Sequence, residues 1–289
     1  MSWVDALLEP FQFEFMLRAY GATILAAVVC ALLSCWLVLI GWSLMGDAVS
    51  HAVLPGVVLA YFFGVPFALG ALVFGLLAVA LIGAIRDTSR LKEDAAIGIV
   101  FTTLFALGLV LVSIIPSQTD LGHIIFGNIL GVSDADLLQI AILAVVAIAV
   151  LLIKRRDLTL FAFDPAHAFA IGLRPKLLSA LLLGVLALTS VVALQVIGVV
   201  LVVAMLIIPG ATAYLLTDRF GRMLWIAPLL GAVAAVVGIT LSYYLDAASG
   251  ALVVLTQGAI FAIVYLFSPT QGIVPRLLTR NRRGVSAVH

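Results

Sequence analysis

The stretch Leu17–Ile40, LRAYGATILAAVVCALLSCWLVLI, decides the fold because it contains a single charged residue, Arg18. A helix of about 20 apolar residues crosses the roughly 30 Å of hydrocarbon in a bilayer. Apolar runs of this kind recur as far as Phe267, and the 289-residue chain is 65% hydrophobic and 10% charged, with a mean hydropathy of +1.31. The dyad alternation of a membrane β-barrel is missing. We therefore expect an all-α, polytopic membrane protein with no soluble domain of its own.

The apolar runs divide the chain into about nine transmembrane helices within one domain, residues 1–289. The second run is short, so eight spans are the alternative. The expected spans are Leu17–Ile40, Val49–Phe63, Phe67–Ile85, Ala95–Ile115, Ala135–Ile153, Leu177–Leu194, Ile197–Leu216, Leu224–Leu245 and Ala251–Phe267.

Basic residues predict the orientation of these spans, because connections rich in Lys and Arg stay in the cytoplasm. With nine spans, all four basic connections fall on the same side. The acidic N-terminal segment and the connection 120–133 fall on the other side, so we expect a periplasmic N-terminus and a cytoplasmic C-terminus. The basic connections are Arg86–Asp94, the long hydrophilic segment 154–176, Asp218–Arg222 and the charged tail 276–289.

The most informative polar stretch is Gly46–Gly56, GDAVSHAVLPG, inside an otherwise apolar span. Asp47 and His51 are four residues apart, so on a helix they share one face. A carboxylate and an imidazole at that spacing can bind one divalent cation, and placing them in a membrane costs several kcal/mol. The alternative is structural, with Asp47 capping a helix and His51 bonded to a neighbouring backbone. Ser50 and the helix-loosening Pro55–Gly56 pair favour a polar-lined pathway.

A second motif lies in the hydrophilic segment, at Asp164–Pro175, DPAHAFAIGLRP. Asp164 is a good N-cap and Pro165 suits the first helical position. We expect a two-turn helix over Ala166–Ile171 that ends at Gly172. Such a short capped helix can fit into the groove of a partner. An ordinary interfacial linker is the alternative, and the residues alone favour it.

Two further stretches carry polar or helix-breaking residues. In Leu206–Arg219, LIIPGATAYLLTDR, we expect Pro209–Gly210 to break the seventh span, either lining a cavity with freed carbonyls or allowing close helix packing. In Asp120–Ser133, DLGHIIFGNILGVS, the side chains of Asp120 and His123 could contact a cation at the outer mouth. A plain interfacial loop is the alternative for this second stretch.

In this order, the four motifs resemble the membrane permease of bacterial ABC importers for manganese, zinc and ferrous iron, and HIIFGNILGVS is most similar to the manganese/iron branch. The resemblance implies a type II importer fold in the bacterial plasma membrane and a second permease copy or paralogue. It also implies cytoplasmic ATPase subunits and a periplasmic or lipoprotein metal-binding protein. It makes Asp47 and His51 the metal pair. The residues it assigns to ATPase coupling are Asp164, Pro165, Ala166, His167, Ala168, Phe169, Ala170, Ile171 and Gly172.

The chain contains no Walker A motif and no HExxH motif, so we expect ATP to be used by another polypeptide and no cofactor to be held permanently. The net charge of +1 identifies no nucleic-acid partner. A metal transporter driven by an ion gradient is one alternative, since it would need neither an ATPase nor the capped helix. A membrane metalloenzyme using Asp47, His51 and His123 is another, but no nucleophile, base and orienting group accompany them.

Overall fold

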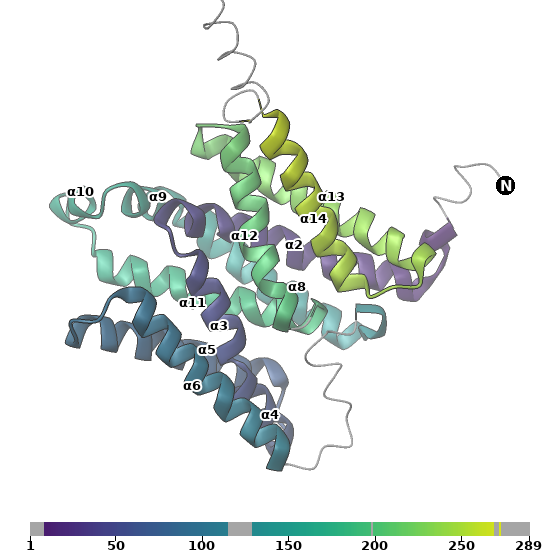
Figure 1. Ribbon diagram of the computed structural model, residues 1–289, viewed down its shortest axis with the longest axis horizontal. Helices are drawn as coiled ribbons and strands as arrows, with labels where there is room; N and C mark the ends of the chain where they lie inside the picture. The colour runs from purple at the N-terminus through teal and green to yellow at the C-terminus, as the bar shows by residue number, and fades with distance from the viewer. Residues whose placement is uncertain (1–8, 115–128, 198, 269–271, 273–289) are drawn as a thin grey trace, which may run out of the picture.

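The computed structural model describes residues 9–114, 129–197, 199–268 and 272, and every regular element among them is helical (Figure 1). Asp120, His123 and the tail 276–289 lie outside these residues. The elements are η1 Glu9–Gln12, α2 Glu14–Ile40, α3 Ser43–Ala52, α4 Leu54–Phe63, α5 Phe67–Thr88, α6 Glu93–Ile114, η2 Ile129–Gly131, α8 Asp134–Ile153, α9 Arg155–Phe163, α10 Pro165–Ala170, α11 Pro175–Ile197, α12 Val199–Leu216, α13 Phe220–Leu245 and α14 Ser249–Phe267.

The described residues include 8 helical segments that are long and apolar enough to cross a membrane, and a shorter apolar helix at Val202–Leu216. These nine segments match the nine expected runs, so the all-helical class is confirmed. One boundary is wrong: the second span begins at Ser43, not Val49, because α3 and α4 together form one crossing segment, Ser43–Phe63. Its polar first turns lower its mean hydropathy to 1.4, which hid the start of the helix.

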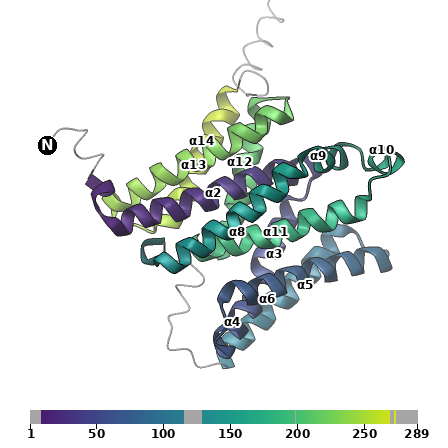
Figure 2. The same ribbon diagram turned by 180° about the vertical axis from the view of Figure 1, so that it is seen from behind.

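Helix α2 is the centre of the bundle and packs against α8, α11, α12 and α13. Its inward residues are mostly small, and Ala19, Ala22, Ala26 and Ala27 are fully buried. In a bilayer no hydrophobic effect drives helices together, so they associate through van der Waals packing. Small residues favour this packing because they let the helices approach closely. Figures 1 and 2 show α4, α5 and α6 on one side of the molecule and α13 and α14 on the opposite side.

The second span is interrupted at Val53, between α3 and α4, as the Pro55–Gly56 pair predicted. Pro55 has no N–H to offer the carbonyl of His51, which accepts a hydrogen bond from Val53 N–H instead. Immediately beyond the interruption, α4 crosses α5 with backbone against backbone. A Cβ added at Gly56 would lie 2.6 Å from the carbonyl carbon of Gly70.

We expect Gly56→Ala to destabilise the protein by about 1–3 kcal/mol, because the new methyl group overpacks a contact whose nearest atoms belong to the backbone. Gly83→Ala in α5 is the matched control, since its Cβ meets nothing within 4 Å and alanine is the better helix former. The measurement is the thermal unfolding midpoint of both purified variants. A midpoint for Gly56→Ala equal to that of Gly83→Ala would contradict the close crossing.

The predicted break at Pro209–Gly210 is wrong, because α12 continues through both residues as one helix. At this point α12 packs closely against α2. A Cβ at Gly210 would lie 2.7 Å from the carbonyl oxygen of Ser34 on α2. The hydroxyl of Thr212 donates a hydrogen bond to the carbonyl of Ile208, one turn earlier in α12. Of the two roles expected for the pair, close helix packing is the one that the contacts support.

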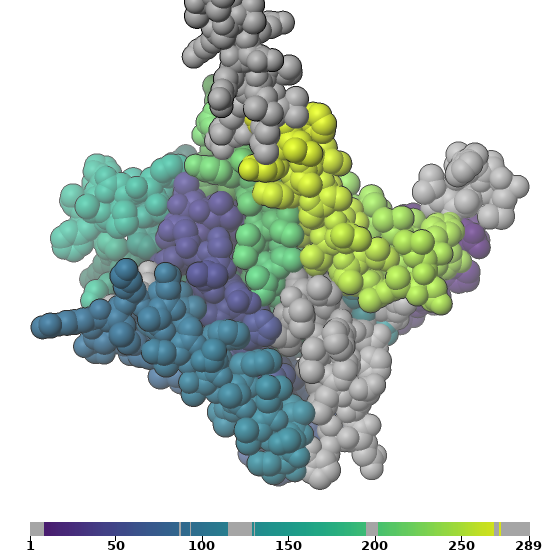
Figure 3. Space-filling view, viewed as in Figure 1, coloured from purple at the N-terminus to yellow at the C-terminus, as the bar shows by residue number. Residues whose placement is uncertain are grey.

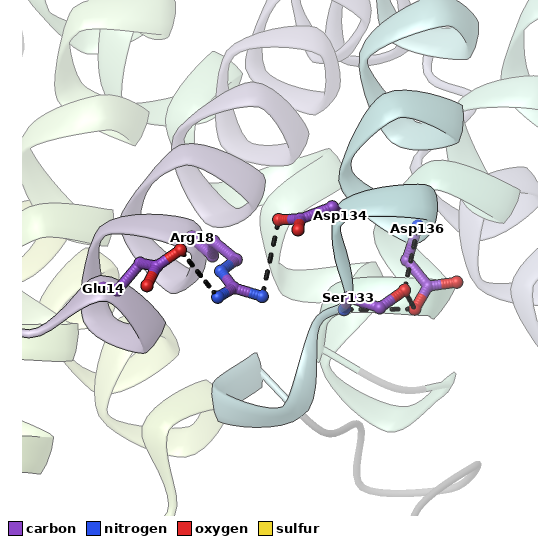
Figure 4. Close-up of polar contacts among 5 residues, drawn as sticks. All are labelled: Glu14, Arg18, Ser133, Asp134 and Asp136. Atoms are coloured by element: carbon purple, nitrogen blue, oxygen red, sulfur yellow. Dashed lines mark hydrogen bonds and ion pairs between the residues drawn. The ribbon is translucent and has the colours of Figure 1, made fainter.

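One charged contact fastens α2 to α8 near the N-terminal ends of both helices. Arg18 donates to Glu14 at 3.0 Å and forms an ion pair with Asp134 at 3.4 Å (Figure 4). Asp134 lies within a capping box in which Ser133 and Asp136 exchange hydrogen bonds at the start of α8. The guanidinium is therefore paired with carboxylates at the end of the bundle, which removes the cost of an isolated charge there.

Candidate metal pathway

The chain positions the candidate pair by turning sharply between α2 and α3. Gly41 ends α2 with a positive φ of 86°, a conformation that costs glycine little. Trp42 is the N-cap of α3, so Asp47 lies inside the helix. The structural alternative for Asp47, a helix cap, is therefore excluded.

Asp47 and His51 do meet on one face of α3, as their spacing predicted. Nε2 of His51 lies 3.2 Å from Oδ1 of Asp47. The side chain of His51 is 18% exposed and that of Asp47 is 37% exposed. In the space-filling view, part of α3 reaches the surface between the blue of α5 and α6 and the green of α12 (Figure 3). A partly exposed carboxylate in a crossing segment needs water, an ion or another chain beside it.

The separation of the two donor atoms suits a shared cation. With metal–ligand bonds of about 2.1 Å, atoms 3.2 Å apart subtend roughly 100° at the metal. That angle lies between the octahedral and tetrahedral values. The described residues contain no group of three or more His, Cys, Asp or Glu side chains that could hold a metal. A full coordination shell would thus need ligands from water or from beyond these residues.

Ser50 does not join the pair. It is buried, and its hydroxyl donates to the carbonyl of Gly46 at 2.7 Å, one turn back in the same helix. Its contribution to a polar-lined pathway, which the sequence favoured, has no support in these contacts.

Two aromatic residues of α6 that the sequence did not single out enclose the imidazole. The ring of His51 lies 5.3 Å from the rings of both Phe101 and Phe105, measured between centroids. Phe101 and Phe105 are four residues apart and therefore share a helix face. That spacing is common in buried helices, and nothing in the sequence connects α6 with α3.

The hydrophilic segment forms the short capped helix that was expected. Asp164 is the N-cap of α10, and its side chain accepts from His167 N–H at 2.9 Å, with Pro165 in the first turn. Gly172 follows the helix with a positive φ of 89°. Ala168 is fully buried, whereas Phe169 is 72% and Ile171 57% exposed. Phe169 in α10 and Ile171 directly after it are thus large apolar side chains on the surface, and α10 lies at the tip of the loop (Figure 1).

Comparison with known proteins shows the family to which the chain belongs. Residues 12–268 match the family model described as the ABC 3 transport family. The manganese transport system membrane protein MntB of Synechocystis is 51% identical over 93% of this chain and 88% of its own length. YfeC of Yersinia pestis, a chelated iron transport system membrane protein, is 45% identical over 99% of this chain and 98% of its own.

A solved structure gives the same answer. PsaBC from Streptococcus pneumoniae, determined in complex with Fab, superposes with a TM-score of 0.86 at 39% identity, covering 93% of this chain and 97% of that one. The chain belongs to the ABC 3 transport family and is a multi-pass bacterial membrane permease subunit of an ABC importer, whose ATPase is a separate subunit.

Proposed function

We propose that this permease passes a divalent transition-metal ion, Mn²⁺ or Fe²⁺, across the inner membrane through a pathway that includes Asp47 and His51. The observation that carries the proposal is the 3.2 Å pair on α3, whose two donor atoms can bind one cation from adjacent positions. The cation is cargo, so the pair has to bind it and then release it.

The donor atoms narrow the class of metal. One carboxylate oxygen and one imidazole nitrogen suit Mn²⁺, Fe²⁺ or Zn²⁺ and lack the thiolate that softer metals prefer. Ligands of this kind cannot select Mn²⁺ by affinity, because it binds weakest in the divalent series. The relatives named above transport manganese and chelated iron, which supports these two metals ahead of zinc.

The missing ligands and the exposed loop suggest the partners. A second permease copy or paralogue beside α3 would add a second carboxylate and imidazole. A periplasmic or lipoprotein metal-binding protein would deliver the ion, and cytoplasmic ATPase subunits would bind the apolar surface of Phe169 and Ile171 on the loop at α10. ATP binding and hydrolysis would then alternate the access to the pair.

Energy coupling separates this proposal from a gradient-driven transporter. In vesicles that contain permease, ATPase and binding protein, we expect uptake of radioactive Mn²⁺ to require ATP and to persist when ionophores collapse the proton and sodium gradients. Uptake that stops with the ionophores and continues without ATP would contradict the proposal.

The charge distribution predicts the orientation of the chain. Basic residues gather in the α5–α6 connection, in 154–176, near Arg219 and in the tail. Reporter fusions at Ser89, Asp164 and Arg282 should therefore report the cytoplasm, and a fusion at Gln118 the periplasm. A cytoplasmic reporter at Gln118 would overturn this topology, together with the outer-mouth role of Asp120 and His123.

A further inference from the structure

The nitrogen of His51 that faces away from Asp47 is in an unusual environment. Nε2 faces the carboxylate, whereas Nδ1 is buried and has no hydrogen-bond partner among the described residues. A histidine that binds a metal almost always donates its other ring N–H to a carboxylate, a carbonyl or water, which orients the ring and makes it a stronger ligand. His51 lacks that support.

The missing hydrogen-bond acceptor for Nδ1 becomes important when Nε2 binds a cation. Nε2 must then offer its lone pair, so the proton of the neutral imidazole moves to Nδ1. The imidazole packs against the rings of Phe101 and Phe105. An aromatic ring is only a weak acceptor for an N–H group. The cation-bound tautomer is therefore held in place by packing more than by hydrogen bonding.

Helix α6 is fixed firmly enough to act as this support. Val100 and Leu104, which directly precede the two phenylalanines in α6, are buried. One turn further on, a Cβ at Gly108 would lie 2.9 Å from two side-chain atoms of Leu54, at the start of α4. Contacts on both sides of the interruption at Val53 thus set the position of the two rings relative to His51.

We propose, on the basis of the proposed function, that Phe101 and Phe105 are positioning residues for the metal pair. They hold the imidazole of His51 by aromatic packing in place of the usual hydrogen-bond acceptor. His51 is thereby oriented toward the cation but stays a weak ligand, which suits a site that must release its ion in every transport cycle.

The test compares two substitutions at each position. Phe101→Gln and Phe105→Gln place an amide oxygen, a true acceptor, against the imidazole, whereas Phe101→Leu and Phe105→Leu remove the ring and stay apolar. Because such acceptors change metal affinity about 10- to 100-fold, at least one Gln variant should bind Mn²⁺ about tenfold more tightly than its Leu counterpart. The same Gln variant should transport Mn²⁺ more slowly than wild type.

Binding is measured by equilibrium dialysis of radioactive Mn²⁺ against the purified permease–ATPase complex, and transport in vesicles after the binding protein is added. Phe62→Gln and Phe62→Leu are the controls, because Phe62 is 61% exposed on α4, and they should keep the wild-type affinity. If no Gln variant binds more tightly than the Leu variant at its position, the inference is overturned. If Asp47→Asn and His51→Gln also bind Mn²⁺ like wild type, the proposed function itself fails.

Discussion

Asp47→Asn should reduce metal uptake to background while the protein still reaches the membrane. The substitution keeps the size of the side chain and removes its charge, and a neutral amide oxygen is a poor replacement for a carboxylate on a divalent cation. Losing a hydrogen-bond partner behind a metal ligand already costs about 10–100-fold in affinity, so losing the charge of the ligand should cost at least as much. His51→Gln should have the same effect. The measurement is uptake of radioactive Mn²⁺ by cells that contain the full complex, with the permease quantified by blot.

A purely structural role predicts a different result. As a side-chain contact four residues apart on one helix, Asp47 and His51 would contribute only about 0.3–0.5 kcal/mol, and uptake would hardly change. Glu14→Gln is the matched control, because Glu14 pairs with Arg18 at the same spacing in α2. Uptake by Asp47→Asn at the level of Glu14→Gln would remove the pair from the pathway.

Phe169→Asp should separate the permease from its ATPase. Phe169 is the most exposed of the large apolar side chains on the loop at α10, and removing a central apolar anchor from an interface costs about 2 kcal/mol or more. That is roughly 30-fold in affinity. We expect the ATPase to be lost during co-purification and uptake to fall in parallel.

The choice of residue matters for this second test. Ala168 is fully buried, so a charge there would disrupt the loop itself and would report nothing about the partner. Leu91→Asp is the control, since Leu91 is also exposed and lies in the α5–α6 connection, on the same predicted side. If the ATPase stays bound to Phe169→Asp as it does to Leu91→Asp, the loop is a simple linker and does not bind the ATPase.

Local chemistry was sufficient to predict the short features of the chain. Asp164 and Pro165 begin α10 and Gly172 follows its end because capping depends on groups only a few residues apart. The face shared by Asp47 and His51 followed from helical spacing in the same way. The start of the second span could not be predicted in this way, because the polar residues of the proposed site also lower the hydropathy by which a span is recognised.

The two Pro–Gly pairs show where sequence reasoning stops. Pro55–Gly56 follows an interruption of the helix at Val53, whereas α12 continues through Pro209–Gly210. The two dipeptides are identical, but their flanking residues and neighbouring helices differ: Gly56 meets Gly70 on α5, and Gly210 meets Ser34 on α2. Phe101 and Phe105 were missed for the same reason, because only the packing of α6 against α3 brings them to His51.

The most direct test of the metal pathway is an anomalous difference map from crystals of the permease complex soaked in Mn²⁺, collected at the manganese absorption edge. We predict a peak within bonding distance of both Oδ1 of Asp47 and Nε2 of His51, and its absence from crystals of Asp47→Asn. A strong peak in the membrane region that contacts neither residue would contradict the account.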